Sequence, residues 1–213
     1  MNRLYICMLF CCIGFGLQAQ TADEILNKTT AQIKSFQSVL LDFDYSMLNE
    51  EMGICESNKG NLTFKSNKYI LNLSQLGLAV YCDGTNSYTY NSEANELTIS
   101  SLEDGDQMLN PATLFSMYEQ GFDAKYLGEA ISNGVKCYHL ELTPQTGNHV
   151  EFSKAEIFIN KQNHFLEHAK MHADGGTVYT LSVKNLQTNQ VIADNQFTFD
   201  QAAHPGVEVI DLR

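Results

Sequence analysis

The feature that most constrains the fold of this chain is an alternation of apolar and polar side chains with a period of two. In the first clear run, Asp42, Asp44 and Ser46 separate four large apolar residues, Leu41, Phe43, Tyr45 and Met47. Similar runs follow, and they are separated by turn signals: Gly60-Asn61, Asp83-Gly84, Asp104-Gly105, Asn133-Gly134 and Asp174-Gly175-Gly176. This period is typical of strands with one buried face, so the sequence predicts an antiparallel meander of about eleven or twelve short strands. The last of these are expected at Phe197-Thr198-Phe199-Asp200 and in the tail Val207–Leu212.

Two helices are predicted beside these strands. Thr21 and Glu24 form a capping-box pattern, and apolar residues then recur at helical spacing, so we expect a helix over Ala22–Ser35. A second, short helix is expected over residues 110–122, where Asn110 suits the N-cap and Gly121 the C-terminal cap. Its apolar face consists of Leu114, Phe115, Met117 and Tyr118. This helix either packs on the core of the sheet or forms a lid over the mouth of an apolar cavity.

The beginning of the chain predicts export. Arg3 precedes an apolar run over residues 4–17 that is too short to span a bilayer, and Ala19 suits a cleavage site. We therefore expect a signal peptide over residues 1–19 and one domain over residues 20–213, exported and not lipid-anchored. Residues 20–213 hold 12 of the Lys and Arg residues and all 25 Asp and Glu, a formal net charge of −13. That charge argues against nucleic acid and anionic lipid as partners.

Signals of catalysis are weak. The sequence contains no phosphate-binding loop, nucleophile elbow or zinc-protease motif. His164, His168 and His172 lie four residues apart, but in a strand that spacing separates two histidines by ~13 Å, too far to share one ion. Cys137 and His139 share a strand face, yet no third residue orients the histidine. We therefore expect no enzyme, no catalytic residue, no cofactor and no metal.

Three cysteines follow the predicted signal peptide: Cys55, Cys82 and Cys137. In an oxidising compartment an odd number allows one disulfide and one free thiol, or three free thiols. The sequence does not choose between these states.

A series of segments carries a resemblance to a known family. In chain order they are Ser35-Phe36 with Leu41-Asp42-Phe43, Gly60-Asn61-Leu62-Thr63-Phe64-Lys65, Asp83-Gly84 with Tyr88-Thr89-Tyr90, Asn110-Pro111 with Leu114-Phe115, Tyr138 with Leu140-Glu141-Leu142-Thr143-Pro144, and Phe197-Thr198-Phe199-Asp200 with Pro205-Gly206-Val207-Glu208-Val209-Ile210-Asp211. In their order and spacing, these segments resemble the periplasmic outer-membrane lipoprotein carriers of the LolA family.

The resemblance implies a mainly β fold, a half-open antiparallel β-barrel of about eleven strands with an N-terminal helix and a helical lid. It implies a monomeric periplasmic carrier that takes acylated lipoproteins from an inner-membrane ABC-type release complex to an outer-membrane acceptor. The acyl chains would lie in an apolar cavity lined by strand residues. The candidate lining residues are Leu41, Phe43, Tyr45, Leu62, Phe64, Tyr69, Leu71, Tyr88, Tyr90, Tyr138, Leu140, Ile157, Tyr179 and Leu181.

One departure from the family pattern affects the transfer step. Well-studied members carry an Arg-Pro pair where this chain has Ser66-Asn67. Lys65 or Lys68 could replace the arginine, although a lysine cannot reproduce the forked guanidinium. This departure leaves the identity of the acceptor undetermined. The sequence also does not specify which lipoproteins are carried or whether the cavity is open or filled. An alternative is an envelope sensor of lipid or lipoprotein on the same fold.

Overall fold

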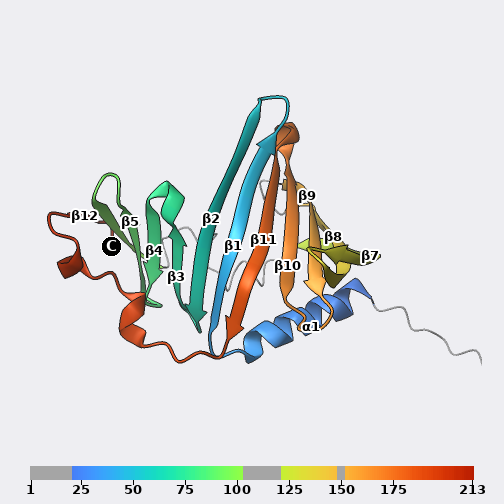
Figure 1. Cartoon of the computed structure of the whole chain (residues 1–213), viewed down its shortest axis with the longest axis horizontal. Coiled ribbons are helices and arrows are strands. Elements are labelled where there is room, and N and C mark those ends of the chain that lie inside the picture. Colours follow the sequence, from blue (N-terminus) through green and yellow to red (C-terminus); the bar gives the residue numbers. More distant parts are fainter. Residues whose placement is uncertain (1–20, 103–120, 148–151) are drawn as a thin grey trace, which may run out of the picture.

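A computed structural model of the chain describes residues 21–102, 121–147 and 152–213 (Figure 1). The described elements are α1 (Ala22–Ser35), β1 (Val39–Asn49), β2 (Ile54–Lys65), β3 (Lys68–Leu73), η1 (Ser74–Leu76), β4 (Leu78–Cys82), β5 (Asn86–Asn91), β6 (Glu96–Ser101), β7 (Phe122–Ser132), β8 (Val135–Pro144), β9 (Phe152–Asn160), β10 (Leu166–Ala173), η4 (Asp174–Gly176), β11 (Val178–Thr188), η5 (Asp194–Phe197), η6 (Gln201–Ala203) and β12 (Glu208–Asp211).

The twelve strands form one sheet in the order β12-β6-β5-β4-β3-β2-β1-β11-β10-β9-β8-β7. The sheet does not close, because β12 and β7 lie at its two edges and do not pair with each other. The pairs are antiparallel except for β12 with β6, which is parallel. The sheet is strongly twisted, as expected for a wide antiparallel sheet, and α1 lies across the lower ends of β9–β11 in Figure 1. The prediction of a half-open, mainly antiparallel barrel is confirmed.

The helix α1 begins and ends at the predicted residues. The Thr21 hydroxyl accepts a hydrogen bond from the Glu24 backbone N–H, and the Glu24 carboxylate accepts one from the Thr21 N–H, which completes the capping box. Ile25 and Leu26 are buried near the start of the helix and Ile33 near its end. This apolar stripe explains why the helix lies on the sheet.

The strand register divides the side chains between two faces of the sheet. Leu41 of β1 is the cross-strand partner of Leu62 of β2, and both are buried beneath α1. We call this side the inner face. Its buried side chains form two clusters, one between the start of α1 and β8, β9 and β10, the other between the end of α1 and β1–β4.

The opposite side, the outer face, has a core of its own at one end. The segment between β11 and β12 runs along the lower edge of the sheet in Figure 1 and brings Phe199, which is buried, onto β4 and β5. Phe197, also buried, lies just before it in η5, which contacts β3. The ring of Phe199 lies 5.8 Å from that of Tyr81 and 5.0 Å from that of Tyr90, centroid to centroid. The C-terminal segment therefore covers the apolar side chains that β4–β6 present outward.

The structure corrects two local predictions. A turn at Gly60-Asn61 was wrong, because β2 continues through both residues, and Gly60 lies opposite Phe43 of β1. Phe197-Thr198-Phe199-Asp200 forms no strand; η5 ends at Phe197, and the last strand is confined to Glu208–Asp211. The turns at Asp83-Gly84, Asn133-Gly134 and Asp174–Gly176 fall between strands, as predicted.

Some predictions lie outside the described residues. These are the signal peptide over residues 1–19, the turn at Asp104-Gly105, and the lid residues Leu114, Phe115, Met117 and Tyr118. Phe122, the last residue of the predicted second helix, is the first residue of β7.

Candidate functional site

Most of the predicted lining residues share the inner face. Residues that lie directly opposite each other on paired strands share one face, so the register identifies the inner face on each strand. Phe64 lies opposite Tyr69, Tyr45 opposite Leu181, and Leu140 opposite Ile157. The twelve lining residues that the register places on this face are Leu41, Phe43, Tyr45, Leu62, Phe64, Tyr69, Leu71, Tyr138, Leu140, Ile157, Tyr179 and Leu181.

These twelve residues differ in burial. Seven are buried in the two clusters that α1 joins: Leu41, Leu62, Phe64, Tyr69, Tyr138, Leu140 and Ile157. The other five are half-buried: Phe43, Tyr45, Leu71, Tyr179 and Leu181. The buried residues hold the fold together, and the half-buried residues are the part of the inner face that a ligand can reach.

The half-buried part centres on the ends of β1 and β11 that lie farthest from α1. The rings of Tyr45 and Tyr179 are stacked with centroids 6.1 Å apart. Met47 lies directly opposite Tyr179 and extends the same row, although it was not among the predicted lining residues. It belongs to the same alternating run as Leu41, Phe43 and Tyr45, so the sequence pattern already placed it on their face. Burial and the nearby Tyr179 and Glu56 raise the pKa of Tyr45, so its phenol stays neutral on this apolar surface.

Tyr88 and Tyr90 were assigned to the wrong face. On β5, Tyr88 lies opposite Tyr81 and Tyr90 opposite Ala79, so both point to the outer face. The Tyr88 hydroxyl donates to Asp83 Oδ2 at 2.9 Å, and the Tyr90 ring packs 5.0 Å from Phe199. Successive side chains of a strand point to opposite faces, and the alternation does not show which face is covered. Here only the C-terminal aromatic segment shows that the face with Tyr88 and Tyr90 is covered.

The Ser66-Asn67 position is the turn between β2 and β3, and Ser66 adopts a positive φ of 57°. The lysines on either side of it both bind Asp194: Lys65 Nζ lies 2.7 Å from Oδ1 and Lys68 Nζ 2.9 Å from Oδ2. Their hydrogen bonds lower the pKa of Asp194 to about 2. Both lysines point to the outer face and hold the C-terminal segment there, so neither reaches the inner face.

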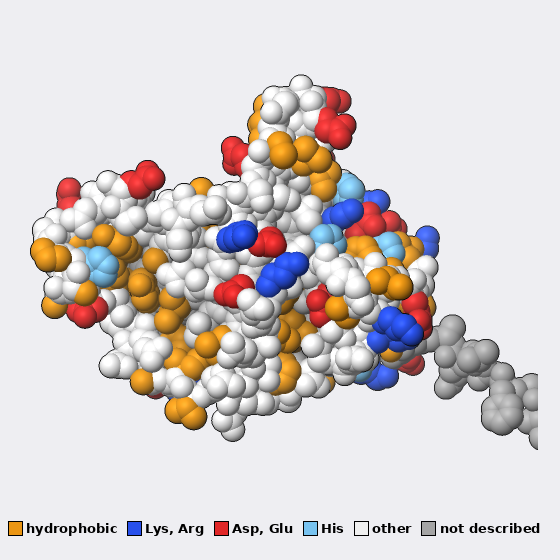
Figure 2. All heavy atoms as spheres, in the orientation of Figure 1, with side chains coloured by type: hydrophobic (Ala, Val, Ile, Leu, Met, Phe, Trp, Pro, Cys, Tyr) orange, Lys and Arg blue, Asp and Glu red, His pale blue; other side chains and the backbone are white. Residues whose placement is uncertain are grey.

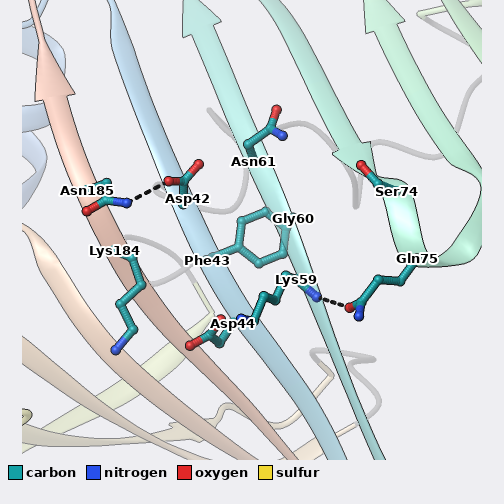
Figure 3. A pocket seen from close by; sticks show the side chains of 10 residues that line it. All are labelled: Asp42, Phe43, Asp44, Lys59, Gly60, Asn61, Ser74, Gln75, Lys184 and Asn185. Atoms are coloured by element: carbon teal, nitrogen blue, oxygen red, sulfur yellow. Dashed lines mark hydrogen bonds between the residues drawn. The ribbon is translucent and has the colours of Figure 1, made fainter.

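The outer face carries a groove of about 590 Å³ over β11, β1, β2 and η1, lined mostly by charged and polar side chains together with Phe43 (Figure 3). Its charged side chains alternate in sign across the strands, with Asp42 opposite Lys184 and Asp44 opposite Lys59. Figure 2 shows charged side chains in the middle of this face. A polar groove does not suit acyl chains, since burying unpaired charge against hydrocarbon costs free energy. The inner face is therefore the candidate site.

The titratable groups seen in the sequence take structural roles. Cys137 Sγ donates to the Val135 carbonyl oxygen at 3.5 Å, while His139 Nε2 lies 3.0 Å from Glu156 Oε2, so cysteine and histidine do not pair. Cys55, Cys82 and Cys137 are free thiols. Within residues 21–102, 121–147 and 152–213, no three metal-binding side chains are grouped as a site, and no helix there is long and apolar enough to cross a membrane.

An unclosed twelve-stranded sheet with a helix across an apolar inner face is an open β-barrel. Residues 34–200 match the family described as "Outer membrane lipoprotein carrier protein LolA", and the chain belongs to this family. Membership implies a protein of the cell envelope.

Two solved structures share the fold. One is an uncharacterized conserved protein from Thermus thermophilus, with a TM-score of 0.62 and 14% identity, covering 89% of this chain and 98% of that one. The other is the lipoprotein LppX of Mycobacterium tuberculosis, with a TM-score of 0.50 and 15% identity, covering 79% of this chain and 95% of that one.

A curated relative is the uncharacterized protein MJ0687 of Methanocaldococcus jannaschii, 27% identical over 209 residues. The match covers 93% of this chain but only 58% of the relative.

Proposed function

We propose that this protein binds the acyl chains of lipoproteins on its inner face and carries them through the periplasm from the inner to the outer membrane. The observation that carries the proposal is the half-buried apolar row of Phe43, Tyr45, Met47, Tyr179 and Leu181 on β1 and β11. This row continues a packed core yet is not itself fully buried. Family membership supports an acylated lipoprotein as the cargo.

The physical chemistry of acyl chains suits such a carrier. Each buried CH₂ contributes ~0.8 kcal/mol, so one chain of about sixteen carbons contributes on the order of 12 kcal/mol when fully buried. Release into water would be very slow at that affinity. Cargo must therefore pass directly from one apolar site to another. The family resemblance implies an inner-membrane release complex of the ABC type before this protein and an outer-membrane acceptor after it.

The inner face favours binding without catalysis. The side chains of its half-buried row are aromatic and aliphatic, and the tyrosine hydroxyl of Tyr45 is held in its neutral form. His139 of β8 and His172 of β10 contact Glu156 on the outer face instead. We therefore assign the protein a carrier role and no reaction.

Native mass spectrometry of the protein, purified without detergent from the periplasm of its own cells, tests the proposal. We expect a fraction with the added mass of an acylated lipoprotein or of lipid at a fixed ratio. The same protein stripped of ligand should take up a synthetic diacylated lipopeptide at one copy per chain. A clean unliganded mass together with no uptake of the lipopeptide would rule out the carrier function.

A further inference from the structure

The hairpin between β1 and β2 extends well beyond β3, its neighbour on one side, and on the other side the turn between β10 and β11 lies beside its end (Figure 1). We call residues 48–56 together with residues 174–177 the acidic tip. The inner-face row leads directly to it, because Met47 precedes the tip by one residue and pairs with Tyr179 at the start of β11. A partner that contacts the tip would therefore lie next to the candidate acyl-binding surface.

The tip is held in a defined conformation by Asn49. Its side chain is buried, at 1% exposure, although it lies near the end of a protruding hairpin. Its Nδ2 donates to the Gly175 carbonyl oxygen at 2.9 Å and to Thr177 Oγ1 at 2.8 Å, and its Oδ1 accepts from the Met52 backbone N–H at 2.9 Å. A surface ordered in advance loses little conformational entropy when it binds a partner.

The tip exposes large apolar side chains. Met52 is 70% exposed and Leu48 is 41% exposed. Leu48 lies opposite Val178, which is half-buried on the same outer face. Figure 2 shows hydrophobic and acidic side chains together on this protrusion. Met52 is flexible and polarizable, and such a side chain adapts to a pocket on another protein.

The charge of the tip has one sign. Glu50, Glu51, Glu56 and Asp174 are all exposed. No Lys or Arg occurs in residues 44–58 or 171–183. This local excess of negative charge repels anionic lipid headgroups and attracts basic protein surfaces.

We propose that the acidic tip docks on a protein of the envelope membranes whose basic side chains surround an apolar recess, with Met52 entering the recess. Its role in the transfer of acyl chains rests on the proposed function, but the docking itself does not require cargo. The occupant is a protein surface, because four carboxylates at the tip disfavour the lipid surface itself.

Cosedimentation of the fluorescently labelled full-length protein, without cargo, tests this proposal. The probes are envelope membrane vesicles from the protein's own cells, the same vesicles after protease treatment, and liposomes made from the extracted lipids. We expect binding to the untreated vesicles alone, weakened when salt rises from about 0.1 M to about 0.5 M. Met52→Ser should weaken that binding about tenfold, and Glu51→Lys by a similar factor.

Glu93→Lys is the matched control, since Glu93 is exposed at the turn between β5 and β6 and the charge change is the same. It should leave binding within about twofold of the wild type. Wild-type binding by Met52→Ser and Glu51→Lys, or equal losses in Glu51→Lys and Glu93→Lys, would overturn the proposal. So would equal binding to protein-free liposomes, or no binding to native vesicles. Failure of lipopeptide uptake with intact docking would count against the carrier function alone.

Discussion

The ring of Phe43 lies against Gly60 of the neighbouring strand, on the inner face of the sheet. A Cβ at Gly60 would lie 2.4 Å from Phe43 Cζ and 2.8 Å from the Asn72 carbonyl oxygen. The ring can swing away, but a backbone oxygen cannot move without disturbing the pairing of β2 with β3. Gly60 is therefore required by space, which is why a glycine that looks like a turn signal lies within a long strand.

Gly60→Ala should lower the free energy of unfolding by about 1–3 kcal/mol, the usual cost of overpacking. Backbone propensity alone predicts the opposite sign, a gain of about 0.5–1 kcal/mol for alanine over glycine. Urea denaturation distinguishes the two, and Gly60→Val should cost more than Gly60→Ala. A more stable Gly60→Ala protein would show that the close contacts do not constrain this position.

The pairing of Asp194 with Lys65 and Lys68 should be visible in a titration. The pKa of Asp194 is lowered to about 2 by hydrogen bonds from these lysines, so the interaction is complete above the unfolded value of about 3.9 and is lost as the pH falls through about 2. Carboxyl-carbon NMR should give a midpoint near the lower value, and Lys65→Ala should raise it. In Asp194→Asn we expect faster proteolysis of residues 189–207, and an unchanged rate would show that these ion pairs do not hold the segment.

The lowered pKa of Glu156 predicts that the stability of the protein depends on pH. Burial raises its pKa, but hydrogen bonds from His139 and His172 and the charge of Lys154 outweigh that effect and lower the pKa overall. A carboxyl with a lowered pKa contributes stability above its unfolded value, which is lost as the pH falls through the folded value. Glu156→Gln should therefore lose less stability than the wild type between about pH 5 and pH 3. Parallel stability curves for the two proteins would contradict this account of the network.

Because Tyr90 lies on the outer face, we expect its substitution to lower the stability of the protein without changing its affinity for acyl chains. Its ring contacts Phe199 and lies 4.6 Å from the ring of His204, so Tyr90→Ala should destabilise the protein by about 2 kcal/mol. Its affinity for a diacylated lipopeptide should not change, because the ring is on the side away from the proposed acyl-binding row. An affinity loss as large as that of Tyr45→Ala would show that Tyr90 takes part in acyl binding.

Local patterns predicted the local structure well. The capping box at Thr21 and Glu24 involves four consecutive residues, and α1 follows it without a shift. Strand alternation placed Leu41, Phe43 and Tyr45 on one face because period-two patterning is also local. The general class of the sheet and most of the inner face followed from such patterns.

Contacts between distant segments could not be predicted in this way. The outer-face core depends on Phe199 reaching Tyr81 and Tyr90, more than a hundred residues earlier in the chain. The pairing of Lys68 with Asp194 spans 126 positions. The alternation within a single strand does not indicate either contact. The face occupied by the tyrosines of β5 and the role of the two lysines could therefore be determined only from the structure.

We propose that acyl chains bind on the inner face, at the ends of β1 and β11 that lie farthest from α1, and two adjacent residues test this proposal most directly. Met47 points to the inner face and Leu48 to the outer face, so Met47→Gln and Leu48→Gln introduce the same polar side chain on opposite sides of one strand. The measurement is the affinity of each variant for a fluorescent diacylated lipopeptide, with urea denaturation to compare their stability. We expect about a tenfold loss for Met47→Gln and less than about a twofold change for Leu48→Gln. Equal affinities for the two variants would contradict the proposed acyl-binding surface.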